Sequence, residues 1–567
     1  MRRYNFIMKK SLLYIGVASV VLSLGFSSCG DDFLETESKT DLNTGTGYST
    51  VETADMALVG CYDGLQQTIS SIGAYGFYLA SEIASDECFA GAGVGDPKNQ
   101  SILDLFDMSP APSYTSVLEP EWKLYYSGIF RCNSLISRED VINWDGDDVA
   151  KGRIIGEARG IRGFLYFDLA RMFGGVPLLL EPTQENLPRA QASEVFEAIL
   201  ADFKFAYENI PADAYNGSNL NSTDGRMSKF AAAALLARAY MFYSGYYGVE
   251  PSTVTKDYVV AALKDVKDNG QYAVETLYKD LWMPASVEIA DDSYSWAVDT
   301  YKGKHYDGTS WVGDISKEIV FNIKANSTST YNGDADGNGF QVFLGQRIAA
   351  HPPYAEGWGI CTVNPEFASE FASDPRYKAS VIDYSTCGVS TDAKILEGSY
   401  EFTGFAIKKY APLCFFDGKR ETIAFELGAM HMIITHYLDF TSVRYTDVLL
   451  MLAELTDGAD GWSDYVAAPR NATIADLSYS TDNLRTQRKF EFAFEGIRYW
   501  DILRYAKDGA YAANALAKQN GVAVKNAGVG ATISFDVANF NSKKGLFQIP
   551  VNQITLSGNV ITQNPGW

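Results

Sequence analysis

The stretch from Ile155 to Leu180 constrains the fold of this chain more than any other. Its small and apolar side chains recur every three or four residues, at Ala158, Ile161, Leu165, Leu169 and Met172. This spacing predicts one face of an α-helix. Gly174 and Gly175 favour a left-handed C-cap and Pro177 prevents the helix from resuming, so we expect the helix to end there. Aromatic residues on its other faces indicate a helix enclosed by neighbours, at the centre of a mostly α-helical scaffold.

Further helical patterns precede and follow this central helix. Amphipathic spacing predicts helices at 54–65, 122–136, 193–209, 228–243, 445–455 and 484–505. The alanine-rich run 228–243 would let helices approach closely, and paired helices with small residues at their seams are typical of tetratricopeptide-like repeats. In 484–505, opposite charges three residues apart predict surface ion pairs that contribute only about 0.2–0.5 kcal/mol each.

The middle third of the chain has a different texture. From 269 to 430 the helical periodicity fades, glycine and aromatic residues become frequent, and short β-like runs such as 318–323 occur. We therefore expect an N-terminal tetratricopeptide-like helical region (50–268), a loop-rich ligand-binding region with short strands (269–430), and a C-terminal helical region (431–567) that closes the same scaffold. The stretch from Gly73 to Pro120 is long for a structureless loop, which favours a functional role.

The start of the chain has the pattern of a targeting segment. Lys9 and Lys10 precede an apolar run that ends in small residues directly before Cys29, as in a bacterial lipobox. We predict a lipoprotein signal peptide (1–28), lipidation of Cys29 and a flexible polar tether (29–49). An ordinary secretory signal is the alternative. No other apolar stretch is long enough to span a bilayer.

Composition and spacing argue against several classes of function. The net charge of −23 would repel a phosphate backbone, so we expect no nucleic-acid partner. The chain has only 4 histidines, and no HExxH, Walker or GxSxG motif occurs in a suitable context, so we expect no cofactor. A glycosidase-like carboxylate pair stays open, because 70 acidic residues will place some carboxylates close together by chance.

One short run resembles part of a calcium site. Asp334, Asp336 and Asn338 match the first half of an EF-hand loop, with glycine following as that loop requires. Gly345 occupies the twelfth position, where a bidentate glutamate is needed. A weak calcium site and a simple turn of Asx and Gly residues are therefore both open.

The cysteines carry little chemistry that can be read from their spacing. Cys29 is one of 7 cysteines, and the absence of a CxxC pair argues against a zinc ribbon or a thioredoxin motif. Cys361 and Cys387 are candidates for a disulfide that closes a loop in an exported protein, with free thiols as the alternative.

Several segments of the chain form a set that occurs in order along nearly all of its mature length. They read Glu157-Ala158-Arg159, Arg162-Gly163-Phe164, Tyr166-Phe167-Asp168-Leu169, Gly174-Gly175-Val176-Pro177-Leu178, Phe494-Glu495-Gly496, Arg498-Tyr499-Trp500-Asp501, Leu546-Phe547-Gln548-Ile549-Pro550 and Gln563-Asn564-Pro565-Gly566-Trp567. Together with the lipobox, the set resembles the SusD/RagB-type outer-membrane lipoproteins, while the middle third matches them only loosely. The resemblance implies a SusD-like helical fold, anchoring to the outer membrane through lipid on Cys29, exposure at the cell surface, and no catalysis.

The same resemblance implies a shallow glycan-binding face built from loops. Sugar rings present flat C–H faces that stack on Trp and Tyr, while Asn, Asp, Lys and Arg bond to the hydroxyl groups. The candidate ligand-binding residues are Trp282, Trp296, Tyr301, Trp311, Tyr331 and Trp358 of the loop-rich region, and Asp86, Lys98 and Asn99 of the 73–120 stretch. For each aromatic residue, the alternative is that it packs its loop onto the scaffold.

These implications lead to one expected function and two rivals. The expected protein binds an oligosaccharide and delivers it to a partner SusC-like TonB-dependent transporter, on which it acts as a lid. The first rival is a RagB-like lipoprotein that captures peptides through backbone hydrogen bonds. The second is a surface glycoside hydrolase on a helical scaffold.

Overall fold

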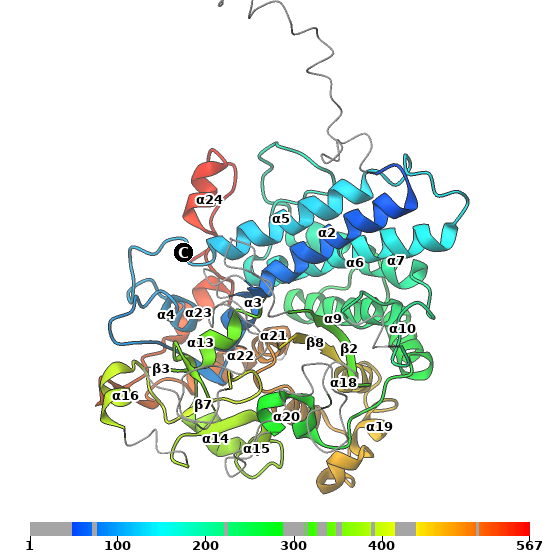
Figure 1. The fold of residues 1–567 in the computed structure, drawn as a ribbon. Coiled ribbons are helices and arrows are strands. Elements are labelled where there is room, and N and C mark those ends of the chain that lie inside the picture. The colour runs from blue at the N-terminus through cyan, green and yellow to red at the C-terminus, as the bar shows by residue number, and fades with distance from the viewer. Residues whose placement is uncertain are drawn as a thin grey trace, which may run out of the picture. The chain divides into compact units, whose positions relative to one another are not determined.

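The long helices of the first half of the chain pack in succession. The computed structural model describes residues 48–70, 76–219, 225–286, 312, 316–325, 337–347, 354–386, 392–413, 438–505 and 510–567, so the predicted signal peptide and most of the tether lie outside the described residues. The long helices are α2 (Val51–Ser70), α5 (Glu119–Ile136), α6 (Asp148–Phe173), α7 (Ala192–Asn209), α9 (Lys229–Tyr247) and α10 (Lys256–Asn269). Each packs against the next in this order (Figure 1). The predicted mostly helical fold with tetratricopeptide-like helix pairs is confirmed.

Helix α6 is the enclosed central helix that the sequence predicts. It begins after Asp147, whose carboxylate accepts a hydrogen bond from the Ala150 N–H at 2.9 Å, an N-cap that satisfies one free donor. It ends at Gly174, where φ is 74° and a residue with a side chain would be strained. From Ile154 onward almost every side chain is buried, because helices pack on several of its faces.

Buried polar side chains of α6 fasten it to its neighbours. Arg162 donates to both carboxylate oxygens of Asp202 on α7, at 2.7 and 2.8 Å. The Tyr125 hydroxyl on α5 donates to Asp168 at 2.7 Å. These four residues are 5% exposed or less. Since a buried polar group is costly unless it is hydrogen-bonded, these contacts select one register between the helices.

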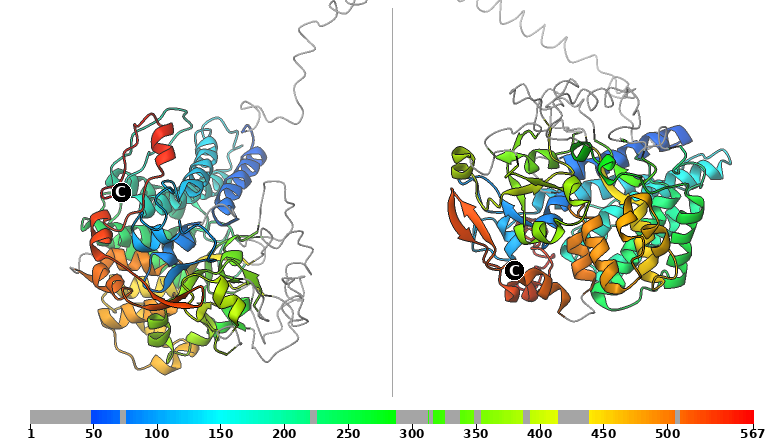
Figure 2. Two further views of the ribbon diagram at one scale, coloured as in Figure 1. Left: turned by 90° about the vertical axis from the view of Figure 1, so that its left-hand side faces the viewer. Right: turned by 90° about the horizontal axis from the view of Figure 1, so that it is seen from below.

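Short strands and helices occur in the described parts of the 73–120 stretch and of the middle third, and at the start of the C-terminal region. The strands are β1 (Cys88–Gly91), β2 (Ile319–Ile323), β3 (Gln346–Arg347), β4 (Glu356–Gly357), β5 (Ile360–Val363), β6 (Val381–Asp383), β7 (Phe405–Ile407) and β8 (Phe440–Arg444). They form two-stranded pairs: β1 with β5, β2 with β8 and β6 with β7 antiparallel, and β3 with β4 parallel. The short helices are α3 (Gly76–Ile83), α4 (Ser101–Leu105), η2 (Tyr278–Leu281), α11 (Met283–Ser286), α13 (Phe340–Leu344), α14 (Pro365–Phe371), α15 (Tyr377–Ser380) and α16 (Ala393–Gly398). The elements between 337 and 413 lie together beside the helical scaffold (Figure 2). The 73–120 stretch is therefore structured rather than a bare loop.

The C-terminal part returns to helices but contradicts one prediction. Its elements are α18 (Tyr445–Leu455), α19 (Trp462–Val466), η5 (Pro469–Ile474), α20 (Thr481–Glu491), α21 (Arg498–Arg504), α22 (Tyr511–Ala517), β9 (Ala523–Asn526), β10 (Val529–Thr532), α23 (Val537–Lys543) and α24 (Val551–Leu556). The predicted continuous helix 484–505 is broken between α20 and α21, where Phe494 and Gly496 adopt φ of 63° and 71°. The cause is tertiary: the freed N–H groups of these two residues donate to the carboxylates of Glu87 and Glu82.

Distant parts of the chain meet throughout this fold. Residues Thr50–Trp567 form one compact unit. The Trp500 indole donates to Ser81 at 2.8 Å, and the Phe547 N–H donates to the Met172 carbonyl at 2.8 Å. Among the described residues, no helix combines the length and the apolar character needed to cross a bilayer.

Candidate functional site

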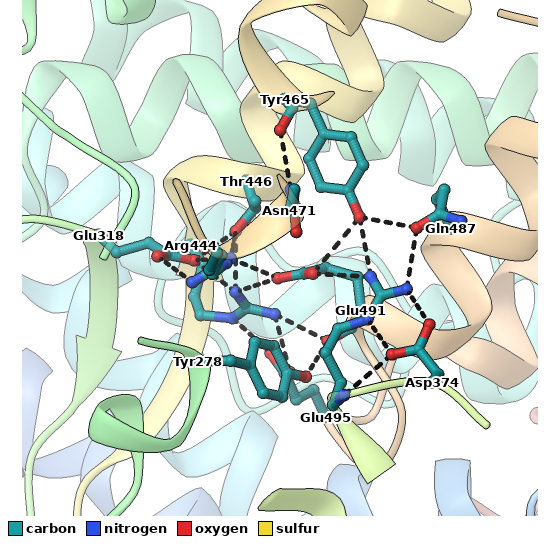
Figure 3. A network of polar contacts seen from close by, with 12 residues as sticks. Tyr278, Glu318, Asp374, Arg444, Thr446, Tyr465, Asn471, Gln487, Glu491 and Glu495 are labelled. Atoms are coloured by element: carbon teal, nitrogen blue, oxygen red, sulfur yellow. Dashed lines mark hydrogen bonds and ion pairs between the residues drawn. The ribbon is translucent and has the colours of Figure 1, made fainter. Parts of the chain in front are cut away.

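The densest group of charged residues in the described structure is a buried network around Arg444 (Figure 3). Arg444, at the end of β8, donates to Glu318 at 2.5 Å, to Glu491 at 2.8 Å and to Glu495 at 2.8 Å. Arg470 also donates to Glu318 and Glu491, at 2.6 Å each. The three carboxylates and Arg444 are 3% exposed or less, so the network joins β2, β8 and α20 from the inside.

The pKa shifts in this network follow from burial and pairing. Burial alone would raise the pKa of Glu491, but Arg470, Arg444 and Arg376 outweigh it and hold that pKa well below its usual range. Burial lowers the pKa of Lys409 to about 8, against the opposing effect of Glu495. A lysine with such a pKa would suit acid–base chemistry, but its side chain is fully buried. We therefore assign Lys409 to the buried network around Arg444.

Two of the predicted ligand-binding residues are engaged inside the protein. Trp282 is 4% exposed; its ring lies 5.1 Å from that of Tyr278 and 4.3 Å below the Lys409 ammonium. Asp86 accepts two hydrogen bonds from Arg498, at 2.7 and 2.8 Å. Burial opposes ionisation of Asp86, but Arg498 outweighs it and lowers the pKa to about 2. Neither side chain faces a ligand, and both act as packing or pairing groups.

Two other predicted residues belong to a half-exposed group, which we call the Lys98 cluster: Asp96, Lys98, Arg347, Trp358 and Tyr400. The Lys98 ammonium donates to the Gly93 carbonyl at 2.6 Å and lies 4.0 Å above the Tyr400 ring. Arg347 on β3 donates to Asp96 at 2.9 Å, with side chains 29% and 35% exposed. The cluster therefore joins three segments that are distant in sequence.

Trp358 extends the cluster at the end of β4. Arg347 is the register partner of Gly357 in the parallel pair β3–β4, which sets Trp358 next to it in the backbone. The indole ring is half-buried and meets the Phe343 ring edge-on, with centroids 4.9 Å apart. One face of a supported, partly exposed aromatic ring is the arrangement that stacking ligands require.

Backbone hydrogen bonds hold the Lys98 cluster in place. The Val94 N–H donates to the Gly398 carbonyl at 3.0 Å, and the Tyr400 N–H donates to the Ala92 carbonyl at 2.9 Å. Asp96 also accepts from the Gly93 N–H at 2.9 Å, which closes a tight turn before Lys98. The donors and the aromatic face are thus presented on an ordered surface, which lowers the entropy cost of binding.

A pair of carboxyl groups lies buried beneath the cluster. Glu401 accepts from the Gly91 N–H at 3.0 Å, and Asp104 accepts from the Ala90 N–H at 3.2 Å. Burial raises the pKa of Glu401 to about 7, and burial together with the charge of Glu401 raises the pKa of Asp104. The two residues are 4% and 0% exposed, so a glycosidic bond has no access to them.

The remaining predictions fall on other parts of the chain. Trp296, Tyr301, Trp311, Tyr331, Asp334 and Asp336 lie outside the described residues. Asn99 is half-buried beside Lys98. Asn338 is fully buried: its amide donates to the Leu438 carbonyl at 2.7 Å and its oxygen accepts from the Phe340 N–H at 2.9 Å. The described part of the chain contains no group of three or more His, Cys, Asp or Glu side chains that could hold a metal ion.

Sequence reasoning found Lys98 and Trp358 but missed their partners. Asp96 lies two residues before Lys98 in a glycine-rich stretch, so proximity alone could have added it. Arg347 carried no signal, because its contact with Asp96 joins residues 251 positions apart. The predicted partner of Cys361, Cys387, lies outside the described residues; Cys361 itself is buried, with its thiol free.

Comparison with known proteins relates this chain to one protein family. A family profile described as "Starch-binding associating with outer membrane" matches residues 32–241, and one described as "SusD family" matches residues 317–567. SusD-like protein P38 of Formosa agariphila is 23% identical over 531 residues, which cover 86% of this chain and 90% of that protein. A SusD-like protein of Bacteroides ovatus is 24% identical over 343 residues, 58% of this chain and 57% of that protein.

Solved structures share the fold at low sequence identity. Surface glycan-binding protein A from Bacteroides thetaiotaomicron, in complex with laminarihexaose, matches with a TM-score of 0.70 and 19% identity over 92% of this chain and 100% of that chain. A laminarin-binding SusD-like protein matches with a TM-score of 0.66 and 22% identity, with the same coverage. With family profiles on both halves of its length and relatives along most of it, the chain belongs to the SusD/RagB family.

Proposed function

We propose that this protein binds an oligosaccharide at the Lys98 cluster and delivers it to a SusC-like TonB-dependent transporter without chemical change. The observation that carries the proposal is the ordered, half-exposed group of Lys98, Asp96 and Arg347, with the half-buried Trp358 next to Arg347 along the paired strands. An aromatic face for the ring and cationic donors for the hydroxyl groups are the two elements that sugar recognition needs. The name and the laminarihexaose ligand of a structural neighbour support the same class of ligand.

The proposal includes a lipid anchor in the outer membrane and exposure of the protein at the cell surface. Lipid on Cys29 would hold the protein at the outer membrane, in keeping with the family description of outer-membrane association. Replacing Cys29 with Ala should move the protein from the membrane fraction to the soluble fraction. Retention of the variant in the membrane fraction would contradict the anchor.

A role without catalysis fits the chemistry of the described residues. The described carboxyl groups with raised pKa values are all buried; they are Glu82, Glu87, Asp104, Glu157, Asp168 and Glu401. A glycosidase needs two carboxyl groups that flank an accessible bond. Product analysis of every binding sample tests this directly, because cleaved glycan would establish a hydrolase instead.

The central experiment is a panel of neutral glycans and peptides measured by calorimetry on the purified full-length protein in detergent. We expect one glycan class to bind with an affinity in the micromolar range, as ordered but shallow sites allow. Trp358→Ala should weaken binding about fivefold or more, if a sugar ring stacks with an energy like the about 1–3 kcal/mol that a base gains on an aromatic side chain. Trp144→Ala is the matched control, because Trp144 is also half-buried but lies in the turn before α6.

Three outcomes would change the proposal. Binding of peptides alone would identify a RagB-like role. Glycan binding that survives Trp358→Ala and Lys98→Ala would move the site away from the Lys98 cluster. Co-purification of the tagged protein without an outer-membrane barrel would contradict the delivery step.

A further inference from the structure

A second cavity lies far along the chain from the Lys98 cluster, between the ends of several helices. It has a volume of about 770 Å³, while two other cavities in the described structure measure about 30 Å³ each, the size of a water site. Its walls come from the start of α7, the end of α9, α22, α23 and the C-terminal residues. Its volume falls within the range of about 300–1,000 Å³ that is usual for small-ligand sites.

The charge of this cavity is opposite to that of the protein as a whole. Arg189 and Lys544 line it, and none of the described lining residues is Asp or Glu, although the chain carries a net charge of −23. The Glu194 carboxylate, two residues after the lining residue Ala192, accepts from the Gln191 N–H at 2.8 Å. The cavity is therefore a local site of positive charge on an acidic protein.

Arg189 has no acidic partner among the described residues. Its guanidinium donates to the carbonyl groups of Gly175 at 2.6 Å, Phe173 at 2.9 Å and Thr562 at 3.0 Å, and to the Asn564 side chain at 2.6 Å. These uncharged acceptors fix its position and leave its charge without a counterion. Another half-buried arginine, Arg153, is paired with the carboxylates of Asp55 and Glu157.

An unsatisfied hydroxyl group accompanies this charge. The Tyr247 hydroxyl is buried and has no hydrogen-bond partner in the described structure. A Cβ at Gly174 would lie 3.9 Å from both this oxygen and Arg189 Nη2, so the two groups share one corner of the cavity. A buried hydroxyl without a partner is unfavourable, and a ligand oxygen at this corner would satisfy it.

Aromatic surface completes the lining. The rings of Tyr246 and Tyr247 meet at 89° with centroids 4.7 Å apart, and Phe540 lies on the α23 side. The Tyr246 hydroxyl donates to the Lys544 carbonyl at 2.7 Å, which links the end of α9 to the end of α23. The cavity thus combines ring surfaces, a hydroxyl donor and two cations.

We propose that this cavity binds a small acidic sugar, one or two rings that carry a carboxylate or sulfate group. The acidic group lies at the corner formed by Arg189 and Tyr247, with Lys544 at the open side, and the ring packs against the tyrosine surfaces. The site shares no residue with the Lys98 cluster, and the inference stands whether or not that cluster binds glycan.

The test compares acidic and neutral probes on the full-length protein in detergent. Glucuronate and glucose 6-sulfate represent the two anionic groups, glucose is the neutral probe, and binding is read by ligand-observed NMR titration. We expect at least one acidic probe to bind about tenfold or more tightly than glucose, because hydrogen bonds to charged groups contribute about 1.5–3 kcal/mol. The better of the two probes identifies the acidic group. Equal binding of glucose, or no binding of either acidic probe, would overturn the proposal.

Variants locate the binding. Ala513→Trp fills the cavity from α22, whereas Asn514→Trp adds the same side chain at the next, exposed position and serves as the control. We expect loss of acidic-probe binding in the first variant and retention in the second, with equal unfolding temperatures. Lys544→Gln should lower affinity severalfold, and Tyr247→Phe should do so through the hydroxyl alone. Undiminished acidic-probe binding by Ala513→Trp would place the ligand elsewhere.

The same variant separates this inference from the proposed function. Ala513→Trp should leave glycan binding at the Lys98 cluster unchanged, and Trp358→Ala should leave acidic-probe binding unchanged. Loss of both activities in either variant would show a single site and contradict the separate cavity site.

Discussion

The Arg444 network and the Lys98 cluster use the same kinds of side chain for opposite purposes. Arg444 is 2% exposed and donates to three carboxylates, while Arg347 has a side chain 29% exposed and one carboxylate partner. Almost all donors and acceptors of the buried network bond to one another, and its side chains are closed off from a ligand. A half-exposed cation with one carboxylate partner keeps some of its N–H donors available for a ligand. Burial and the number of partners, rather than residue type, separate the two roles.

The largest effect is expected at the centre of the buried network. Glu491→Gln removes the charge that Arg376, Arg444 and Arg470 share, and leaves three buried guanidinium groups with one carboxylate charge fewer between them. We expect a loss of about 3–5 kcal/mol in the free energy of unfolding, measured by chemical denaturation. Asp482→Asn, on the exposed first turn of the same helix, is the control and should change it by less than about 0.5 kcal/mol. A loss below that limit for Glu491→Gln would show that the network contributes little to stability.

Two tryptophans make the same comparison within one residue type. Trp282→Ala should lower the free energy of unfolding by about 3–5 kcal/mol, because it opens a cavity next to Lys409 in the interior. Trp358→Ala should lower it by less, since its ring is already partly in water, and should instead weaken ligand binding. Thermal unfolding and calorimetry on both variants check this. Equal destabilisation by the two variants would remove the distinction between the regions.

A pH effect is expected from the carboxyl pair beneath the Lys98 cluster. The pKa of Glu401 is about 7 in the folded protein and about 4.3 in an unfolded chain, so folding favours the protonated form. Its contribution to stability is fully present below pH 4 and is lost as the pH rises to 7. Glu401→Gln should therefore be more stable than the parent protein by about 3 kcal/mol at pH 8, with no difference at pH 4. Denaturation curves at the two pH values measure this, and a difference that does not change with pH would contradict it.

The smallest effect on stability is expected at the surface. Asp96→Asn removes the partner of Arg347 in a half-exposed ion pair, which costs about 0.2–1 kcal/mol in the free energy of unfolding. The same change should alter glycan affinity, because it frees the guanidinium of Arg347 and changes its position. Chemical denaturation and calorimetry on one sample separate the two effects. A loss of several kcal/mol would place this pair with the interior networks.

The sequence predicted those features whose causes are local. The ends of α6 follow from Asp147 and Gly174, and its burial follows from apolar residues on every face. The prediction of one continuous helix at 484–505 was wrong because the cause of its break is not local. Its break depends on the carboxylates of Glu82 and Glu87, which accept hydrogen bonds from N–H groups 414 and 407 residues away in the sequence.

The same division applies to the candidate site. Trp282 and Trp358 are both expected in the loop-rich region, but one lies in the interior and the other is half-buried at the surface. The charge pairs expected on the surface of 484–505 are buried, and Arg488 pairs with Asp447 and Asp501 rather than with Glu491. Spacing along a helix identifies neighbours on that helix, and it carries no information about a partner from another element.

The long-range contacts of this fold have a consequence for how the chain comes to be folded. Asp86 and Arg498 are 412 residues apart, and the end of α6 is completed by hydrogen bonds from Phe547 and Asn564. These contacts can form only after the C-terminal residues have been synthesised, and contacts of such high sequence separation form slowly. Helices α2 to α10, which pack in succession, can associate earlier, so completion of the end of α6 is the step that waits for the whole chain.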